Sequence, residues 1–199
     1  MKTLFLTNEY PPNIYGGAGV HVDYLSRELG RLMEVEVRCF GDQDMQQGPL
    51  RVRGSQVDTS GYTCGKPLAG VFGAVQRSLD FNTRSIDADI VHCHTWYSHF
   101  GGILAKLNYG IPLVVTVHSL EPLRPWKREQ LGGGYDFTCW LERTTIEMAD
   151  AVIAVSRGTR QDIERLFQVD PAKVHIIFNG IDPEEYRKGD RAPALAKYG

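Results

Sequence analysis

The segment of residues 118–128 combines side chains that bind polar substrates. It contains His118, the carboxylate of Glu121 and three cations, Arg124, Lys127 and Arg128. A histidine can donate a hydrogen bond to a sugar hydroxyl or stabilise developing charge. Arginine is suited to a bidentate contact with phosphate, so the cations could hold a phosphorylated ligand. The alternative is a solvated basic loop, because such clusters are common on protein surfaces.

A second candidate site is the run Gly16, Gly17, Ala18 and Gly19, which precedes a predicted helix. Glycines let backbone N–H groups approach an anion closely, and a helix N-terminus carries about half a positive charge. A diphosphate is the expected ligand, and a turn that needs only glycine's backbone freedom is the alternative. The spacing differs from the Gly-x-Gly-x-x-Gly of dinucleotide sites, which disfavours a nicotinamide-dependent oxidoreductase.

A third group of residues, 92–99, contains three histidines next to Trp96 and Tyr97. His92 and His94 share one face of a predicted strand, and with His99 they would suit zinc. No further ligand at a fixed spacing and no carboxylate accompanies them, so we predict no metal here. Aromatic rings just past a strand end can stack on sugars, whereas packing in the core is the alternative for either ring.

The elements that must position these groups alternate between strand and helix. Alternation with short connections predicts an α/β fold with a mostly parallel sheet and helices on both faces. Ligands of such sheets bind outside the carboxyl ends of the strands, where all three groups are expected. Apolar periodicity predicts strands at residues 4–6, 34–40, 50–53, 89–94, 111–117, 151–155 and 174–178, and helices at 22–32, 68–86, 101–109, 135–148 and 157–167, the last capped by Ser156.

Composition restricts the class of protein. Lys and Arg (22) nearly balance Asp and Glu (24), which argues against a nucleic-acid partner. No run of about 18 apolar residues is present, so no membrane association is predicted. The four scattered cysteines are typical of a reduced, cytoplasmic protein, and the N-terminal residues are typical of a first strand rather than a signal peptide.

Six motifs occur in an order that resembles a known enzyme family. Together they resemble the N-terminal half of GT-B retaining glycosyltransferases, most closely the short bacterial type of glycogen synthase that includes α-maltose-1-phosphate synthase. The resemblance extends over the chain to about residue 186. The motifs are residues 9–12, 15–22, 94–97, 118–134, 151–156 and 179–182.

The resemblance implies a Rossmann-like sheet in residues 1–182, the acceptor-side domain of a GT-B fold. Residues 183–199 would then begin the linker to a C-terminal donor-binding domain that would be the partner of this one. The implied reaction is retaining α-1,4-glucosyl transfer from ADP-glucose to a glucan end or to glucose 1-phosphate. The resemblance implies a sugar nucleotide as substrate and no cofactor or metal.

The resemblance also implies roles for individual residues. His118 would contact the transferred glucose near its reacting end, and residues 16–19 would approach the donor diphosphate. The longer glycogen synthases carry a lysine before the paired glycines, whereas this chain has Ile14 and Tyr15. A sucrose- or lipid-directed glycosyltransferase and a non-catalytic glucan-binding module are the alternatives. The expected sugar and acceptor residues are Thr95, Trp96, Tyr97, Glu121, Arg124, Lys127, Arg128 and Asn179.

Overall fold

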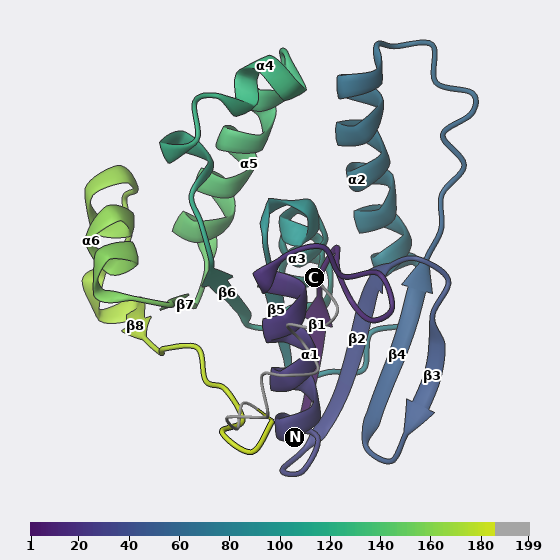
Figure 1. The fold of residues 1–199 in the computed structure, drawn as a ribbon, viewed down its shortest axis with the longest axis vertical. Coiled ribbons are helices and arrows are strands. Elements are labelled where there is room, and N and C mark those ends of the chain that lie inside the picture. The colour runs from purple at the N-terminus through teal and green to yellow at the C-terminus, as the bar shows by residue number, and fades with distance from the viewer. Residues whose placement is uncertain (186–199) are drawn as a thin grey trace, which may run out of the picture.

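An eight-stranded sheet organises the computed structural model, which describes residues 1–185 (Figure 1). Its strands are β1 (Lys2–Leu6), β2 (Glu34–Phe40), β3 (Asp44–Gln47), β4 (Leu50–Ser55), β5 (Ile90–His94), β6 (Leu113–Val117), β7 (Ala151–Ala154) and β8 (Val174–Ile176). Their order across the sheet is β3-β4-β2-β1-β5-β6-β7-β8. Among the strands that the structure describes, β3 and β4 alone pair in antiparallel fashion, so the predicted mostly parallel α/β sheet is confirmed.

Within residues 1–185, six α-helices connect these strands. They are α1 (Gly17–Leu29), α2 (Lys66–Thr83), α3 (Trp96–Tyr109), α4 (Lys127–Leu131), α5 (Gly134–Met148) and α6 (Arg157–Leu166), with short 3-10 turns at Glu121–Leu123 and Pro171–Lys173. Figure 1 shows α1 in front of the central strands, with α2 and α5 at the end of the sheet to which the strands point. The connections therefore place helices around the carboxyl ends of the strands.

The alternation of side chains along β2 explains how both faces are covered. Val35 and Val37 are buried against Val22 of α1 on one face. Arg38 points to the other face and donates a hydrogen bond to the carbonyl of Phe81 near the end of α2. Because successive strand residues point to opposite faces, a single strand can serve both layers of helices.

Three segments differ most from the sequence-based prediction, and one of them, helix α4, lies in a stretch that was expected to be a loop. β3 was not predicted, because all four of its residues are exposed and its polar edge carries no apolar alternation. Helix α3 begins at Trp96 rather than at residue 101. Trp96 is only 3% exposed and packs with Val71, Ile103 and Leu141, so its apolar ring belongs to the core that α3 forms with α2 and α5.

The start of α6 agrees with the prediction. The Ser156 hydroxyl accepts a hydrogen bond of 3.0 Å from the backbone N–H of Thr159, as an N-cap residue does. Of the predicted linker, residues 186–199 lie outside the described residues, so the domain boundary stays a prediction. Within residues 1–185, none of the helices has both the length and the apolar character that a membrane span requires.

Candidate functional site

The loops that follow the strands line one cavity of about 580 Å³ at the carboxyl edge of the sheet. Gly17 lies beyond β1, Thr95 follows β5 directly and His118 follows β6 directly. All three line this cavity, together with Asn179 beyond β8. The predicted convergence of separate β-to-α connections is therefore confirmed, and it is the position at which α/β sheets bind ligands.

The glycine loop is held by a carboxylate that the sequence did not indicate. Glu9 is 4% exposed and accepts hydrogen bonds from the backbone N–H groups of Tyr15 (3.1 Å) and Gly16 (2.8 Å). A Cβ on Gly19 would lie 2.7 Å from the Cβ of Glu9, so the loop needs glycine there to pack closely. Gly16, Gly17 and Ala18 line the cavity, whereas Gly19 packs against Glu9 behind it.

The N-terminus of α1 remains available to an anion. Helix α1 begins at Gly17, with no side-chain cap and no acidic residue in its first turn. A Cβ at Gly17 would meet nothing within 4 Å, so a ligand can approach the backbone at this position. First-turn N–H groups have no partner within the helix, and they attract negative charge. This is the geometry expected for a diphosphate, although Glu9 already occupies the N–H of Gly16.

Thr95 connects the strand end to this loop. Its backbone φ is +67°, a strained value for a β-branched residue, and such strain is concentrated at functional sites. Its hydroxyl donates to Asn8 (2.8 Å), and the Asn8 amide donates to the Tyr15 hydroxyl (2.6 Å). The backbone turn at Thr95 starts α3 so that the stacked rings of Trp96 and Tyr97 reach the cavity wall.

His118 lies half-buried in the cavity wall beside two further histidines. Its Nε2 is 3.3 Å from Nδ1 of the fully buried His94, and its ring lies edge-on to His21 at 4.9 Å between centroids. Burial, assisted by the neighbouring His21, lowers the pKa of His118 to about 4. The imidazole is therefore uncharged at neutral pH and acts as a hydrogen-bonding group rather than a cation.

The three predicted cations differ in their surroundings. Lys127 is buried and its ammonium group donates to Glu121 at 2.8 Å. The Arg124 side chain is 35% exposed, lines the cavity and donates to the Ser119 hydroxyl at 3.3 Å and to Glu121 at 3.5 Å. Arg128 does not line the cavity and instead pairs with Asp136 on the surface. The structure thus brings Arg124 and Lys127 to the site and turns Arg128 away from it.

Glu121 and Glu142 form a buried pair beneath these cations. Glu121 is 2% exposed and its backbone N–H donates to the Glu142 carboxyl group at 2.7 Å. Burial raises the pKa of Glu142 to about 8, and the nearby Glu121 charge adds to the rise. Glu142 therefore keeps its proton at neutral pH, and Lys127 pairs with Glu121.

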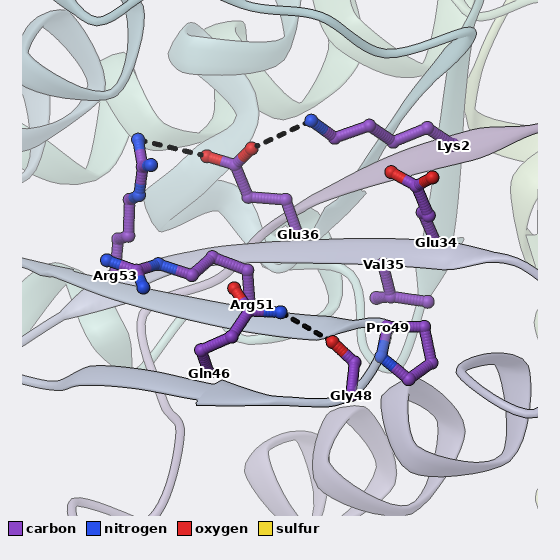
Figure 2. A pocket seen from close by; sticks show the side chains of 9 residues that line it. All are labelled: Lys2, Glu34, Val35, Glu36, Gln46, Gly48, Pro49, Arg51 and Arg53. Carbon is purple, nitrogen blue, oxygen red and sulfur yellow. Dashed lines mark hydrogen bonds and ion pairs between the residues drawn. The ribbon is translucent and has the colours of Figure 1, made fainter.

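A second cavity, of about 520 Å³, lies at the opposite edge of the sheet (Figure 2). Figure 2 shows Lys2 and Arg53 directed at the carboxylate of Glu36, with separations of 3.5 and 3.8 Å. Glu36 also accepts a 2.8 Å hydrogen bond from the buried Arg38. Burial would raise the pKa of Glu36, but the adjacent cations outweigh it and lower the pKa. These cations are engaged in a structural ion-pair network, and no predicted site residue lies here.

Four residues near the site were not singled out from the sequence: Asn8, Glu9, His21 and Glu142. Glu9 and His21 lie within motifs that suggested the family, but nothing in their spacing predicts which groups they contact. Glu142 is one polar residue on a helix, and only its burial against the 118–128 loop reveals its role. A pattern of alternating or periodic residues could not have identified any of the four.

Comparisons with known proteins agree with this geometry. The sequence pattern of Glycosyltransferase Family 4 matches residues 15–185. The chain is 44% identical over 97% of its length to alpha-maltose-1-phosphate synthase of Mycolicibacterium smegmatis, of which it covers 48%. It is 29% identical to a glycogen synthase of Mycobacterium tuberculosis, covering 97% of this chain and 51% of that protein.

The fold also occurs in solved structures. Sucrose-phosphate synthase from Thermosynechococcus elongatus superimposes with a TM-score of 0.74 over 99% of this chain and 53% of that one, at 16% sequence identity. At this identity the similarity concerns the fold alone. In each of these comparisons the chain spans about half the length of the relative that it matches.

Proposed function

The chain belongs to glycosyltransferase family 4 and has the N-terminal GT-B fold, and on that premise we propose that it forms the acceptor-side half of a retaining α-1,4-glucosyltransferase. The proposed donor is ADP-glucose, and the proposed acceptor is glucose 1-phosphate or a glucan end. The name of the 44% identical relative, alpha-maltose-1-phosphate synthase, supports a phosphorylated sugar as acceptor or product.

One observation carries the proposal: Gly17, Trp96 and His118 line the same cavity. They belong to three different connections, and the partly exposed Tyr97 that stacks on the buried Trp96 gives the cavity an aromatic wall beside the anion site and the imidazole. A sugar nucleotide needs all three kinds of contact at once, for its diphosphate, its sugar face and its hydroxyls. An NAD-type site is not favoured, because the loop lacks the dinucleotide spacing of glycines.

The donor diphosphate is proposed to lie at the N-terminus of α1. The N–H groups of the first turn would hydrogen-bond the phosphate oxygens, and the helix dipole would stabilise the charge that develops as the diphosphate departs. Neither Ile14 nor Tyr15 supplies a cation at this loop. At this loop, therefore, the departing diphosphate would be stabilised by backbone dipoles.

His118 is proposed to bind the transferred glucose. The low pKa of His118 keeps its ring neutral, so a ring nitrogen can exchange hydrogen bonds with a sugar hydroxyl without introducing charge near the reacting carbon. The acceptor would approach from the side of Tyr97 and Arg124, which both line the cavity. Retention of configuration would follow if the acceptor attacks from the face that the diphosphate leaves.

Product analysis tests the proposal directly. The protein extended to the length of its relatives is incubated with ADP-glucose and either glucose 1-phosphate or glycogen. We expect a new α-1,4 bond, with transfer lowered about 100- to 1000-fold by His118→Ala, the typical loss when a charge-stabilising donor is removed. His175→Ala, an exposed histidine on β8, serves as the control. Transfer that is unaffected by His118→Ala would contradict the role given to this residue.

A further inference from the structure

Arg77 of α2 differs from the other arginines of residues 1–185 that lie over an aromatic ring. Its guanidinium is 4.8 Å from the centre of the Phe40 ring, but within this range it forms no hydrogen bond and no ion pair. Arg77 therefore carries a positive charge to which the described residues supply no counterion. The other stacked arginines each pair with a carboxylate: Arg27 with Asp23, Arg128 with Asp136 and Arg143 with Glu147.

The position of Arg77 makes an unpaired charge unfavourable. The side chain is partly buried, and its Nε is shielded from solvent without a hydrogen-bond partner. Burial lowers the pKa of Arg77 from its usual value, and the nearby Tyr62 opposes this effect only in part. Charges taken out of water are normally paired, so a guanidinium in these surroundings indicates that an anion binds to it.

Ser55 supplies a second unpartnered polar group at the same end of the sheet. It ends β4 and pairs with Phe40, the last residue of β2. The Phe40 ring packs against Phe81 of α2, and paired residues of neighbouring strands point to the same face, so Ser55 also faces α2. Ser55 is 2% exposed, and its hydroxyl oxygen has no hydrogen-bond partner. A guanidinium and a hydroxyl thus both lie beside Phe40.

We propose that Arg77 and Ser55 form a binding site for a phosphate group at the carboxyl ends of β2 and β4. The planar guanidinium can donate two parallel hydrogen bonds to phosphate oxygens, and the serine hydroxyl can donate a third. A Cβ at Gly73 would lie 3.2 Å from Arg77 Nη1, so glycine at this position of α2 gives the guanidinium its space. The ligand is inorganic phosphate or a phosphate monoester such as a sugar phosphate, because both present the same oxygens.

This phosphate site is separate from the sugar cavity but next to it. Phe40 packs edge-on against Tyr97, with 6.2 Å between the ring centres, and Tyr97 lines the cavity. Arg77 and Ser55 do not line it. A phosphate group bound by them lies behind the aromatic wall and leaves the acceptor position free. The inference therefore goes beyond the proposed function and does not depend on it.

An NMR titration of the purified, isotope-labelled chain with inorganic phosphate tests this inference without sugar nucleotide or turnover. Sodium chloride keeps the ionic strength constant. We expect saturable shifts of the backbone amide signals of Phe40, Ser55 and Arg77. Arg77→Gln should raise the Kd about 10- to 100-fold, because hydrogen bonds from a charged group are lost. Ser55→Ala should raise the Kd about 2- to 10-fold, because the lost hydrogen bond comes from a neutral group.

Arg143→Gln is the matched control, because Arg143 also stacks on a ring but pairs with Glu147. This variant should bind phosphate as the unaltered chain does, and the amide spectrum of each variant establishes that it is folded. A parallel titration with glucose 1-phosphate distinguishes the two sources. A Kd below that of inorganic phosphate would identify a monoester as the ligand, and an equal or higher Kd would identify the free ion. Three results would overturn the proposal: no saturable shift of these signals, shifts that Arg77→Gln leaves unchanged, or shifts that Arg143→Gln removes.

Discussion

The two cations that reach the cavity differ in how freely each can bind a ligand. Lys127 is buried in an ion pair with Glu121, so its charge is already compensated. Arg124 has a longer contact with the same carboxylate and is partly exposed to the cavity. A phosphate on the acceptor would therefore meet the guanidinium of Arg124, while Lys127 keeps the loop folded.

Replacing Arg124 by Gln should distinguish the two proposed acceptors. A hydrogen bond to a charged group contributes about 1.5–3 kcal/mol, so the KM for glucose 1-phosphate should rise about 10- to 100-fold. The KM for a maltooligosaccharide, which lacks the phosphate, should change little. Steady-state kinetics on the protein extended to the length of its relatives measure both values. Arg128→Gln is the control, because Arg128 pairs with Asp136 outside the cavity. Equal effects on the two acceptors would exclude phosphate recognition by Arg124.

Glu142 should make stability depend on pH. The pKa of about 8 in the folded state exceeds the usual value of 4.5 because the carboxyl group is buried. Between these two values the unfolded chain loses a proton that the folded chain retains, so this group reduces stability as pH rises, by at most about 1.4 kcal/mol per pH unit. Glu142→Gln should remove that decline, as measured by urea unfolding at several pH values.

The exposed Glu129 on α4 provides the comparison for this experiment. Glu129→Gln should leave the pH dependence of the unfolding free energy unchanged. The prediction would be contradicted if the unfolding free energies of Glu142→Gln and of the unaltered chain changed in parallel from about pH 5 to pH 8. Glu142 would then have to be ionised in the folded protein.

At the scale of the secondary-structure elements, Arg38 fixes the connection between α2 and β5. Its guanidinium donates to the carbonyl groups of Phe81, Arg84 and Ser85, and it pairs with Glu36. Arg38 is 2% exposed, so its charge depends on this partner. Arg38 of β2 thereby holds the segment that joins the end of α2 to the start of β5.

Removing the Glu36 charge should destabilise this connection strongly. Loss of one partner from a buried ion pair typically costs about 3–5 kcal/mol, because the other charge stays buried without compensation. We expect Glu36→Gln to lower the free energy of unfolding in urea by that amount. The exposed Glu34 lines the second cavity together with Glu36. Glu34→Gln should change the free energy of unfolding by less than about 0.5 kcal/mol. Similar losses for the two variants would contradict the network.

The contact between α3 and the sheet depends on a glycine. A Cβ at Gly102 would lie 2.3 Å from the Sγ of Cys93 and 2.9 Å from Leu113. Gly102→Ala should therefore destabilise the protein by about 1–3 kcal/mol through overpacking. Gly70→Ala in the exposed face of α2, where a Cβ meets nothing within 4 Å, should instead stabilise it by about 0.5–1 kcal/mol. Thermal unfolding of both variants measures the difference in sign.

At the scale of the whole molecule, the cavity is poor in positive charge for a sugar nucleotide. Among the described residues that line it, the Lys and Arg side chains are Arg124 and Lys127, and both contact Glu121. The glycine loop contributes backbone N–H groups alone. The chain also spans about half the length of the curated relatives it matches.

Residues 1–199 alone should therefore fold without transferring glucose. Each missing charge-stabilising donor costs about 3–4 kcal/mol in the transition state, so a few absent contacts suppress turnover. Incubation of the purified chain with ADP-glucose and either acceptor should give no detectable product, whereas the protein at the length of its relatives should give one. Turnover by residues 1–199 would show that this half carries a complete active site.

The order of strands and helices was accessible from the sequence, because periodic apolar residues record which side of each segment is buried. The seven predicted strands and five predicted helices are all present, and Ser156 caps α6. The pattern failed where burial is not periodic. The polar edge strand β3 and the first turn of α3 gave no such signal, and Trp96 entered the core instead of an exposed loop.

The sequence by itself determined the α/β class, the family and the connections that carry polar residues, since these depend on local order along the chain. Only the tertiary structure decided which of those residues meet. The order β2-β1-β5-β6 places the ends of three strands side by side, and so gathers His21, His94 and His118 from positions far apart in sequence. It also separated Arg128 from Arg124, because the direction of a side chain depends on packing that sequence spacing does not record.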